Sequence, residues 1–378
     1  MENTFLSYYQ FRKDVHRHPE LSNEERETTG RIKHFLESNR LKFVEFEKFY
    51  GGYTRIDVGA DKTFCMRADI DALPLKEDTG ADFCSENSGV MHACGHDMHT
   101  AIAAGLACEL NKVKERLSCN IVILFQPAEE ANPVGGAKPL VDSGFLEEQK
   151  IDEVYALHMW PSLPVGEMEV CAGPIMAASD RFIVKIQGKS AHAAEPHKGV
   201  DAILIGNDIC TALSQKLRRE VDPFSPVSIS IGSFKTIGRY NIICDHVILE
   251  GTVRTTNEKT REFLQHRIKE IASSVARCYG GSATVEIIPG YGVVFNDKKL
   301  FCQMRDCAER VLGQKNVHTD IHCSLIGEDF YYYGTKAPVL YLHMGCESQY
   351  PLHSNRFLPN EKALEYSIKL MREYFLSR

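Results

Sequence analysis

The stretch SCNIVILFQPAEE, residues 118–130, decides the fold class of this chain. Its central residues are apolar and rich in branched side chains, without polar alternation, which is typical of a strand buried on both faces. Two acids, Glu129 and Glu130, follow the strand directly. A buried strand that runs into charged side chains fits the interior of a parallel sheet with a site along one edge.

Other apolar segments share this form. They are KTFCMRADID (62–71), DEVYALHMW (152–160) and KAPVLYLHMG (336–345). Helical segments lie between them, such as 99–117 and 136–148. Strands that alternate with helices predict an α/β fold built on a doubly wound, mostly parallel sheet. Ligands of such sheets bind at the carboxyl ends of the strands, so the site is expected there.

The pattern changes near Gly173. From there SDRFIVKIQGKSAH and later strands alternate polar with apolar residues, and helical segments fall at about 199–219 and 258–279. The order βαββαβ predicts a smaller α+β domain with one helix-covered face, inserted into the first domain. The expected domains are a discontinuous first domain, 1–174 and 290–378, and an inserted domain, 175–289.

The composition is that of an ordinary globular protein, with 43% hydrophobic and 25% charged residues. A net charge of −7 over 378 residues, without a long run of one sign, predicts neither a nucleic-acid nor a membrane partner. The N-terminus lacks the basic-then-apolar order of a signal peptide, and no CxxC pair occurs among the 13 cysteines. We therefore expect a cytoplasmic protein.

The segment GVMHACGHDMHTAIAAG, residues 89–105, concentrates metal-binding side chains. Cys94 and His96 are two residues apart, so in an extended or looping backbone they project to the same side. Thiolate and imidazole together suit Zn²⁺ and other borderline metals. Two alternatives stay open from these residues alone: a cysteine nucleophile with a histidine base, and structural residues at the start of a helix.

Acids after the predicted strands supply further candidates. Adjacent carboxylates point in different directions, so one of Glu129 and Glu130 can bind metal while the other carries protons. Asp69 and Asp71 suit carboxylates that accept the far N–H of a metal-bound imidazole and so fix its tautomer. Their structural alternative is a turn at the strand end.

Two histidines complete a candidate set at the same sheet edge. His158 ends its strand, and His353 lies in YPLHSNRF. Taken alone, each of them could be a structural histidine and not a metal ligand. Five ligands exceed the needs of one tetrahedral zinc with an open position, and they suffice for two metals that share a bridging ligand. The set is Cys94, His96, Glu130, His158 and His353.

Recognisable motifs run along nearly the whole chain. They are FRKDVHRHPELSNEE, MRADIDALPLKEDTG, GVMHACGHDMHTA, ILFQPAEE, GGAKPLVDSG, ALHMWPSLPVGEM, KIQGKSAHAAEPHKGVDA, EGTVRT, GEDFYYY and PLHSNRFLPNE. With them the chain resembles the M20 metallopeptidase/amidohydrolase family, in the branch of N-acyl-amino-acid and auxin-conjugate amidohydrolases. The resemblance implies a dinuclear-metal catalytic domain with an inserted α+β lid, which agrees with the pattern above.

The resemblance also assigns roles to residues. It implies that the five candidate ligands hold the metals and that Glu129 is the general base. His192, in GKSAHAA, resembles the lid histidine that reaches the scissile carbonyl, often from the partner subunit. Asn241 and Arg254 lie where the family contacts substrate. Apart from the resemblance, Asp97 is expected to be a neighbour that orients the ligands or a residue at the start of the helix.

The chain also departs from the family pattern. The lid strand reads KTIGRYNIICD, which keeps Asn241 but places Gly238 and Arg239 beside it, and LHSNRF adds Arg356 near His353. No departure removes a ligand. These changes therefore concern the substrate side chain and not the reaction.

The expected activity is metal-dependent hydrolysis of an N-acyl amino acid, such as an N-acetyl amino acid, to a free amino acid and a carboxylic acid. Two divalent ions are expected, Zn²⁺ first because of the thiolate ligand, with Mn²⁺, Co²⁺ or Ni²⁺ as alternatives. The alternative function is a metallo-dipeptidase or aminopeptidase-like hydrolase of the same fold. A homodimer through the lid domain is expected from the family and from that domain's edge strand.

Three rival classes explain the residues less well. A metal-independent cysteine hydrolase leaves Glu130, His158 and His353 without a role. A catalytically dead binding protein would have lost a ligand or Glu129, and none is lost. A dinuclear phosphatase would need cationic phosphate anchors at the site, and no such cluster is apparent in the sequence.

Overall fold

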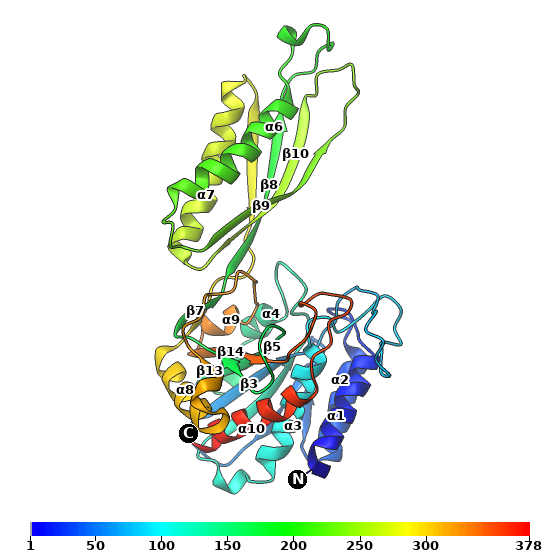
Figure 1. Cartoon of the computed structure of the whole chain (residues 1–378), viewed down its shortest axis with the longest axis vertical. Coiled ribbons are helices and arrows are strands. Elements are labelled where there is room, and N and C mark those ends of the chain that lie inside the picture. The colour runs from blue at the N-terminus through cyan, green and yellow to red at the C-terminus, as the bar shows by residue number, and fades with distance from the viewer. Residues whose placement is uncertain (1) are drawn as a thin grey trace. The chain divides into compact units, whose positions relative to one another are not determined.

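The computed structural model describes residues 2–378, with side chains from Phe5 onward. The chain forms two compact units, each drawn in Figure 1. The first unit consists of Met1–Ile175, Phe295–His322 and Asp329–Arg378, and the second of Met176–Val294 and Cys323–Glu328. The short segment 323–328 therefore belongs to the second unit, although it lies within the range 290–378 that is expected for the first domain.

The first unit is built on an eight-stranded sheet of order β1-β2-β4-β3-β5-β14-β6-β13. Its strands are β1 (Phe43–Glu45), β2 (Gly52–Ile56), β3 (Thr63–Asp69), β4 (Asn120–Gln126), β5 (Glu153–Trp160), β6 (Met168–Glu169), β13 (Val317–His318) and β14 (Val339–Gly345). The four central strands β4, β3, β5 and β14 run parallel. Antiparallel pairs occur toward the edges. The predicted α/β fold with a mostly parallel sheet is confirmed.

Helices cover this sheet. They are α1 (Glu2–Arg17), α2 (Arg26–Ser38), α3 (His96–Asn111), α4 (Ala137–Asp142), α5 (Phe145–Glu148), α8 (Lys298–Leu312), α9 (Tyr331–Gly334) and α10 (Lys362–Leu376). Helix α3 packs against α1 and α10 and is buried along almost its whole length. Its small residues permit this: a Cβ on Gly105 would lie 2.5 Å from Ile368 Cδ1. Close packing on α3 fixes the position of its first residue, His96.

The second unit has a four-stranded sheet of order β11-β8-β10-β9, in which all pairs are antiparallel. The strands are β8 (Ala178–Gln187), β9 (Val227–Thr236), β10 (His246–Thr255) and β11 (Ser282–Ile288), and the main helices are α6 (Ala202–Thr211) and α7 (Glu258–Cys278). Burial alternates along β8, which leaves one face for the helices. Asp201 and Asn257 cap the two helices through their side chains.

Two short strands, β7 (Gly173–Met176) and β12 (Val294–Asn296), pair where the chain passes between the units. Among the described residues, no helix combines the length and apolar character that a membrane span requires.

Candidate metal centre

The candidate ligands lie at the carboxyl ends of the central strands, as parallel-sheet geometry requires. Glu129 and Glu130 follow β4, and His158 lies near the end of β5. Gly95 has φ 89°, a left-handed conformation that glycine adopts without strain, and it turns the chain between Cys94 and His96. The turn brings the thiol and the first side chain of α3 to the same edge.

The five candidate ligands form two overlapping groups. Cys94, His96 and His158 make one group, and Cys94, Glu130 and His353 make the other; within each group the ligand atoms lie within 4.8 Å of one another. Cys94 Sγ is 3.5 Å from His158 Nε2, and His353 Nε2 is 3.1 Å from Glu130 Oε1. Cys94 therefore belongs to both groups, as a bridging ligand would.

The segment around His353 is held against the Cys94 segment. The backbone N–H of His353 donates to Ala93 O at 2.8 Å. His353 itself has φ 62°, which is uncommon for a residue with a Cβ and is found mostly where surrounding contacts impose it. A backbone hydrogen bond thus places a distant segment of the chain beside the cluster.

Asp71 orients two of the candidate ligands. His96 Nδ1 lies 3.1 Å from Asp71 Oδ1 and 2.9 Å from Asp71 O, so Nε2 is free to face a metal. That Nε2 is buried and has no hydrogen-bond partner among the described residues. Asp71 Oδ2 accepts from the backbone N–H of Glu130 at 2.9 Å. The orphaned imidazole nitrogen among thiol and carboxylate ligands fits a metal site.

Asp69 and Asp97 contact other partners. Asp69 Oδ1 is 2.5 Å from His99 Nδ1, and His99 Nε2 accepts the N–H of Met159. Asp97 is buried against Arg12, whose Nε donates to it at 2.7 Å, and against His16. Asp97, which lies in the first turn of α3, therefore joins that turn to Arg12 and His16. Asp69 contacts the same turn through His99, and its Oδ2 also lies 3.7 Å from His96 Nε2.

Burial and charge explain the protonation tendencies at the site. Burial, followed by Glu130 and Glu129, raises the pKa of the Cys94 thiol well above its ordinary value. Burial, followed by His99, lowers the pKa of His158, which keeps the imidazole neutral as a ligand must be. A cysteine nucleophile needs a lowered thiol pKa, so these surroundings disfavour a metal-independent cysteine hydrolase.

Beside the candidate metal ligands lies a buried ionic network that was not predicted from the sequence. Arg67 Nη1 lies 2.6 Å from Asp69, its Nη2 lies 2.7 Å from Asp329, and its Nε donates to Gln126 at 2.8 Å. The signal was an arginine inside the otherwise apolar run of β3. A charged side chain in a doubly buried strand requires buried partners.

His192, Asn241 and Arg254 all belong to the second unit. His192 and Asn241 are exposed and lie on adjacent segments, because Ala193 N donates to Asn241 O at 3.0 Å. Arg254 is half-buried on β10, and its Nη1 donates to Leu325 O at 2.8 Å. The structure thus brings His192 and Asn241 together, while their catalytic and binding roles stay predictions.

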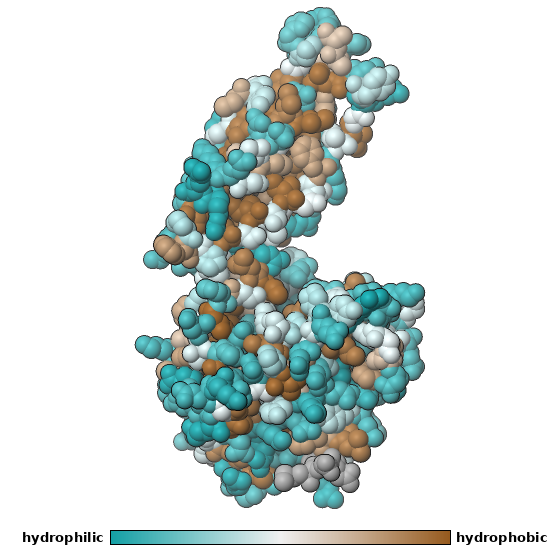
Figure 2. Space-filling model, viewed as in Figure 1, coloured by the Kyte–Doolittle hydropathy of each residue, from teal (hydrophilic) through white to brown (hydrophobic). Residues whose placement is uncertain are grey.

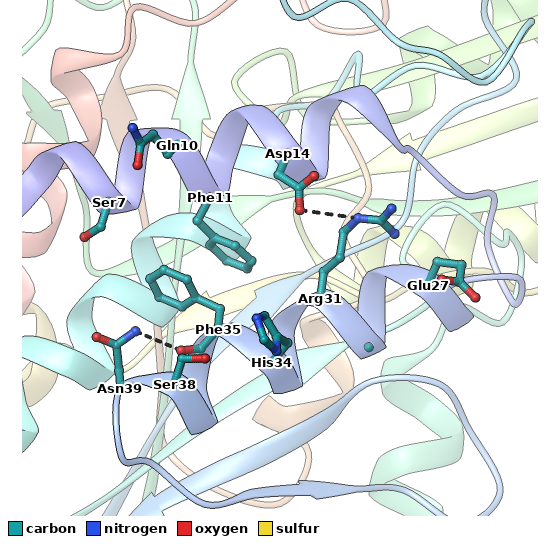
Figure 3. A pocket seen from close by; sticks show the side chains of 11 residues that line it. Ser7, Gln10, Phe11, Asp14, Glu27, Arg31, His34, Phe35, Ser38 and Asn39 are labelled. Carbon is teal, nitrogen blue, oxygen red and sulfur yellow. Dashed lines mark hydrogen bonds and ion pairs between the residues drawn. The ribbon is translucent and has the colours of Figure 1, made fainter.

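A separate groove between α1 and α2 contains none of the candidate residues. It has a volume of about 710 Å³ (Figure 3). Phe11 stacks on Phe35 at 4.2 Å between ring centres, and Arg31 pairs with Asp14 at 3.4 Å across it. These contacts join the two helices and offer no metal-binding group of the described residues.

The sequence profile of the peptidase family M20/M25/M40 matches residues 65–377. The chain belongs to this family. The match covers the candidate ligands and most of both units of the M20 protein.

Relatives of known name match over nearly the full chain. An N-acetyl-L-cysteine deacetylase of Bacillus subtilis is 35% identical over 97% of this chain and 85% of its own length. An N-acetyldiaminopimelate deacetylase of Geobacillus thermodenitrificans is 32% identical over 98% of each chain. The crystal structure of a dinuclear metal-binding M20 peptidase from Bacillus subtilis has a TM-score of 0.88 at 31% identity, covering 100% of this chain and 99% of that one.

Proposed function

We propose that this M20 protein is a metal-dependent amidohydrolase that cleaves N-acyl amino acids, such as N-acetyl amino acids, to a free amino acid and a carboxylic acid. The observation that carries the proposal is the pair of overlapping ligand groups that share Cys94, with Glu129 beside them. The names of the two deacetylase relatives support the substrate class.

Two divalent ions would be held by the five candidate ligands. When bound, they would lower the pKa of a water and polarise the amide carbonyl. The thiolate and imidazole ligands favour Zn²⁺, with Mn²⁺, Co²⁺ or Ni²⁺ as alternatives. The dinuclear M20 neighbour supports the number of ions.

Glu129 and Glu130 divide the work of the acidic pair. Glu130 has its backbone N–H fixed by Asp71 and its carboxylate beside His353, as a ligand requires. Glu129 is 6% exposed and lies with His96 and Glu130 in a third group of close ligand atoms. It would take the proton of the attacking water and pass it to the leaving nitrogen.

The second unit would complete the site as a lid. His192 would stabilise the oxyanion that develops on the carbonyl, and Asn241 and Arg254 would contact substrate. Ile203 and Leu204 on α6 and Phe234 on β9 are exposed apolar side chains of this unit, and they support a homodimer formed through it. Figure 2 shows apolar surface on this unit. A cytoplasmic location completes the proposal.

The alternative is a metallo-dipeptidase or aminopeptidase-like hydrolase that acts on small peptides at the same site. The M20 neighbour described as a peptidase favours this reading. Both activities use the same ligands and base, so the substrate distinguishes them.

The test is a substrate panel with protein stripped of metal and reloaded with each of the four ions. The proposal expects hydrolysis of N-acetyl amino acids only after reloading. Faster cleavage of matched dipeptides would favour the alternative. Failure to hydrolyse any amide with any ion would overturn both.

A further inference from the structure

The segment that carries Glu129 has a constrained backbone. Ala128, which directly precedes Glu129, has φ 58°. The left-handed conformation is unfavourable for a residue with a Cβ. Such a conformation persists only where the surrounding structure imposes it. The contacts of Ala128 therefore determine where the side chain of Glu129 begins.

One buried side chain makes the decisive contact. Glu25 Oε1 accepts the backbone N–H of Ala128 at 2.7 Å, and Glu25 is 0% exposed. On the other side of Glu129, Asp71 Oδ2 accepts the N–H of Glu130 at 2.9 Å. Two carboxyl groups from different parts of the chain thus hold the backbone N–H groups of the residues on either side of Glu129.

Glu25 is itself anchored just before α2. Its carbonyl oxygen accepts from both the N–H of Thr29 at 3.0 Å and the Thr29 hydroxyl at 2.6 Å. The same hydroxyl accepts the N–H of Gly51 at 2.7 Å. The start of α2 therefore supplies a fixed support for the Glu25 side chain.

The surroundings of Glu25 require an oxygen acceptor and do not require a charge. Its other oxygen, Oε2, is buried without a hydrogen-bond partner among the described residues. Burial, followed by repulsion from Asp71, raises the pKa of Glu25 to about 7. Burying an acid with one such oxygen costs stability, which points to a role for the carboxyl group beside the site.

We propose that Glu25 is a positioning residue that fixes the general base Glu129 by accepting the backbone N–H of Ala128. The inference rests on the proposed function, because it concerns the base of that reaction. Without the acceptor, Ala128 can relax out of the left-handed conformation and carry Glu129 away from the substrate. A displacement of about 1 Å at a catalytic group can cost on the order of 100-fold in rate.

The test compares Glu25→Met, which keeps the volume without an oxygen, with Glu25→Gln, which keeps an oxygen without the charge. Glu25→Met should lower kcat about 10–100-fold, with KM and metal content unchanged. Glu25→Gln should restore kcat to within about threefold of the original protein. The exposed neighbour provides the matched control, and Glu24→Met should change neither constant.

A second readout does not depend on activity. In the metal-free protein, amide hydrogen exchange in a peptide spanning 126–131 should speed up in Glu25→Met and stay slow in Glu25→Gln. Should Glu25→Met not fold, Glu25→Asp takes its place, because its carboxyl group reaches less far; it should lower kcat at constant KM and speed up the same exchange.

Unchanged kcat in the Met variant, or in the Asp variant that replaces it, would overturn the positioning role. An equal loss in the Gln variant would overturn it too, since the charge would then be what matters. Failure of the unaltered protein to hydrolyse amides would overturn the proposed function alone. Unchanged exchange in Glu25→Met, or in the Glu25→Asp variant that replaces it, would show that Glu25 does not hold Ala128.

Discussion

Replacing Glu25 by glutamine should change how the stability of this protein depends on pH. Burial, followed by repulsion from Asp71, raises the pKa of Glu25 from 4.5 to about 7 in the folded chain. Between these values the folded state holds a proton that the unfolded state has released. The free energy of unfolding contributed by Glu25 therefore falls as the pH rises from 4.5 to 7.

The size of the effect follows from the two pKa values. Each pKa unit is worth about 1.4 kcal/mol, so the full loss across the interval is about 3 kcal/mol. Between pH 5 and pH 8 the same linkage gives about 2.5 kcal/mol. Glutamine does not titrate. The free energy of unfolding of Glu25→Gln, relative to that of the original protein, should therefore rise by about 2.5 kcal/mol between pH 5 and pH 8.

The assay is urea unfolding of the metal-free protein at pH 5 and pH 8. The chain has one tryptophan, Trp160 on β5, so its fluorescence reports the unit that contains Glu25. The exposed control Glu24→Gln should shift stability equally at both pH values. The expected linkage is wrong if the free energies of unfolding of Glu25→Gln and the original protein differ by the same amount at both pH values.

Two further substitutions test the support behind the site. Arg67→Met removes the cation that pairs with two buried carboxylates and should lower the free energy of unfolding by about 3–5 kcal/mol in the urea assay, whereas the exposed Lys33→Met should cost less than about 1 kcal/mol. Gly136→Ala puts a Cβ 1.8 Å from Pro127 O, and it should reduce kcat in a folded protein because it shifts the segment that precedes Glu129. In the control Gly30→Ala, the new Cβ meets open space, so kcat should stay unchanged. Equal stability losses in the first pair, or equal kcat values in the second, would contradict these expectations.

Patterns repeated along the chain were enough to predict the main sheet. The apolar run 121–125 lies in the fully buried strand β4, and Glu129 and Glu130 follow this strand at the sheet edge. Gathering of the candidate ligands at that edge follows from parallel topology, since all parallel strands end on one side. Only the direction of the strands was needed to predict this part of the site.

Contacts between segments that are far apart in the chain could not be predicted from the sequence. Nothing local in the glutamate-rich start of α2 indicates that Glu25 reaches the backbone beside Glu129. His99 has the same local sequence pattern as the candidate ligands. However, its Nδ1 is hydrogen-bonded to Asp69, and its Nε2 accepts a backbone N–H. Only the packing of α2 and α3 separates a positioning carboxyl or a structural imidazole from a ligand.

Under the proposed function, Glu130 binds metal while Glu129 moves protons. These two roles are separated by measuring bound metal and the turnover of an N-acetyl amino acid in Glu129→Gln and Glu130→Gln, each loaded with zinc. Glu129→Gln should keep its two ions and lose more than ~10³-fold in kcat, as removal of an essential acid–base group does, whereas Glu130→Gln should lose metal. Near-normal turnover by metal-loaded Glu129→Gln would contradict this role of Glu129.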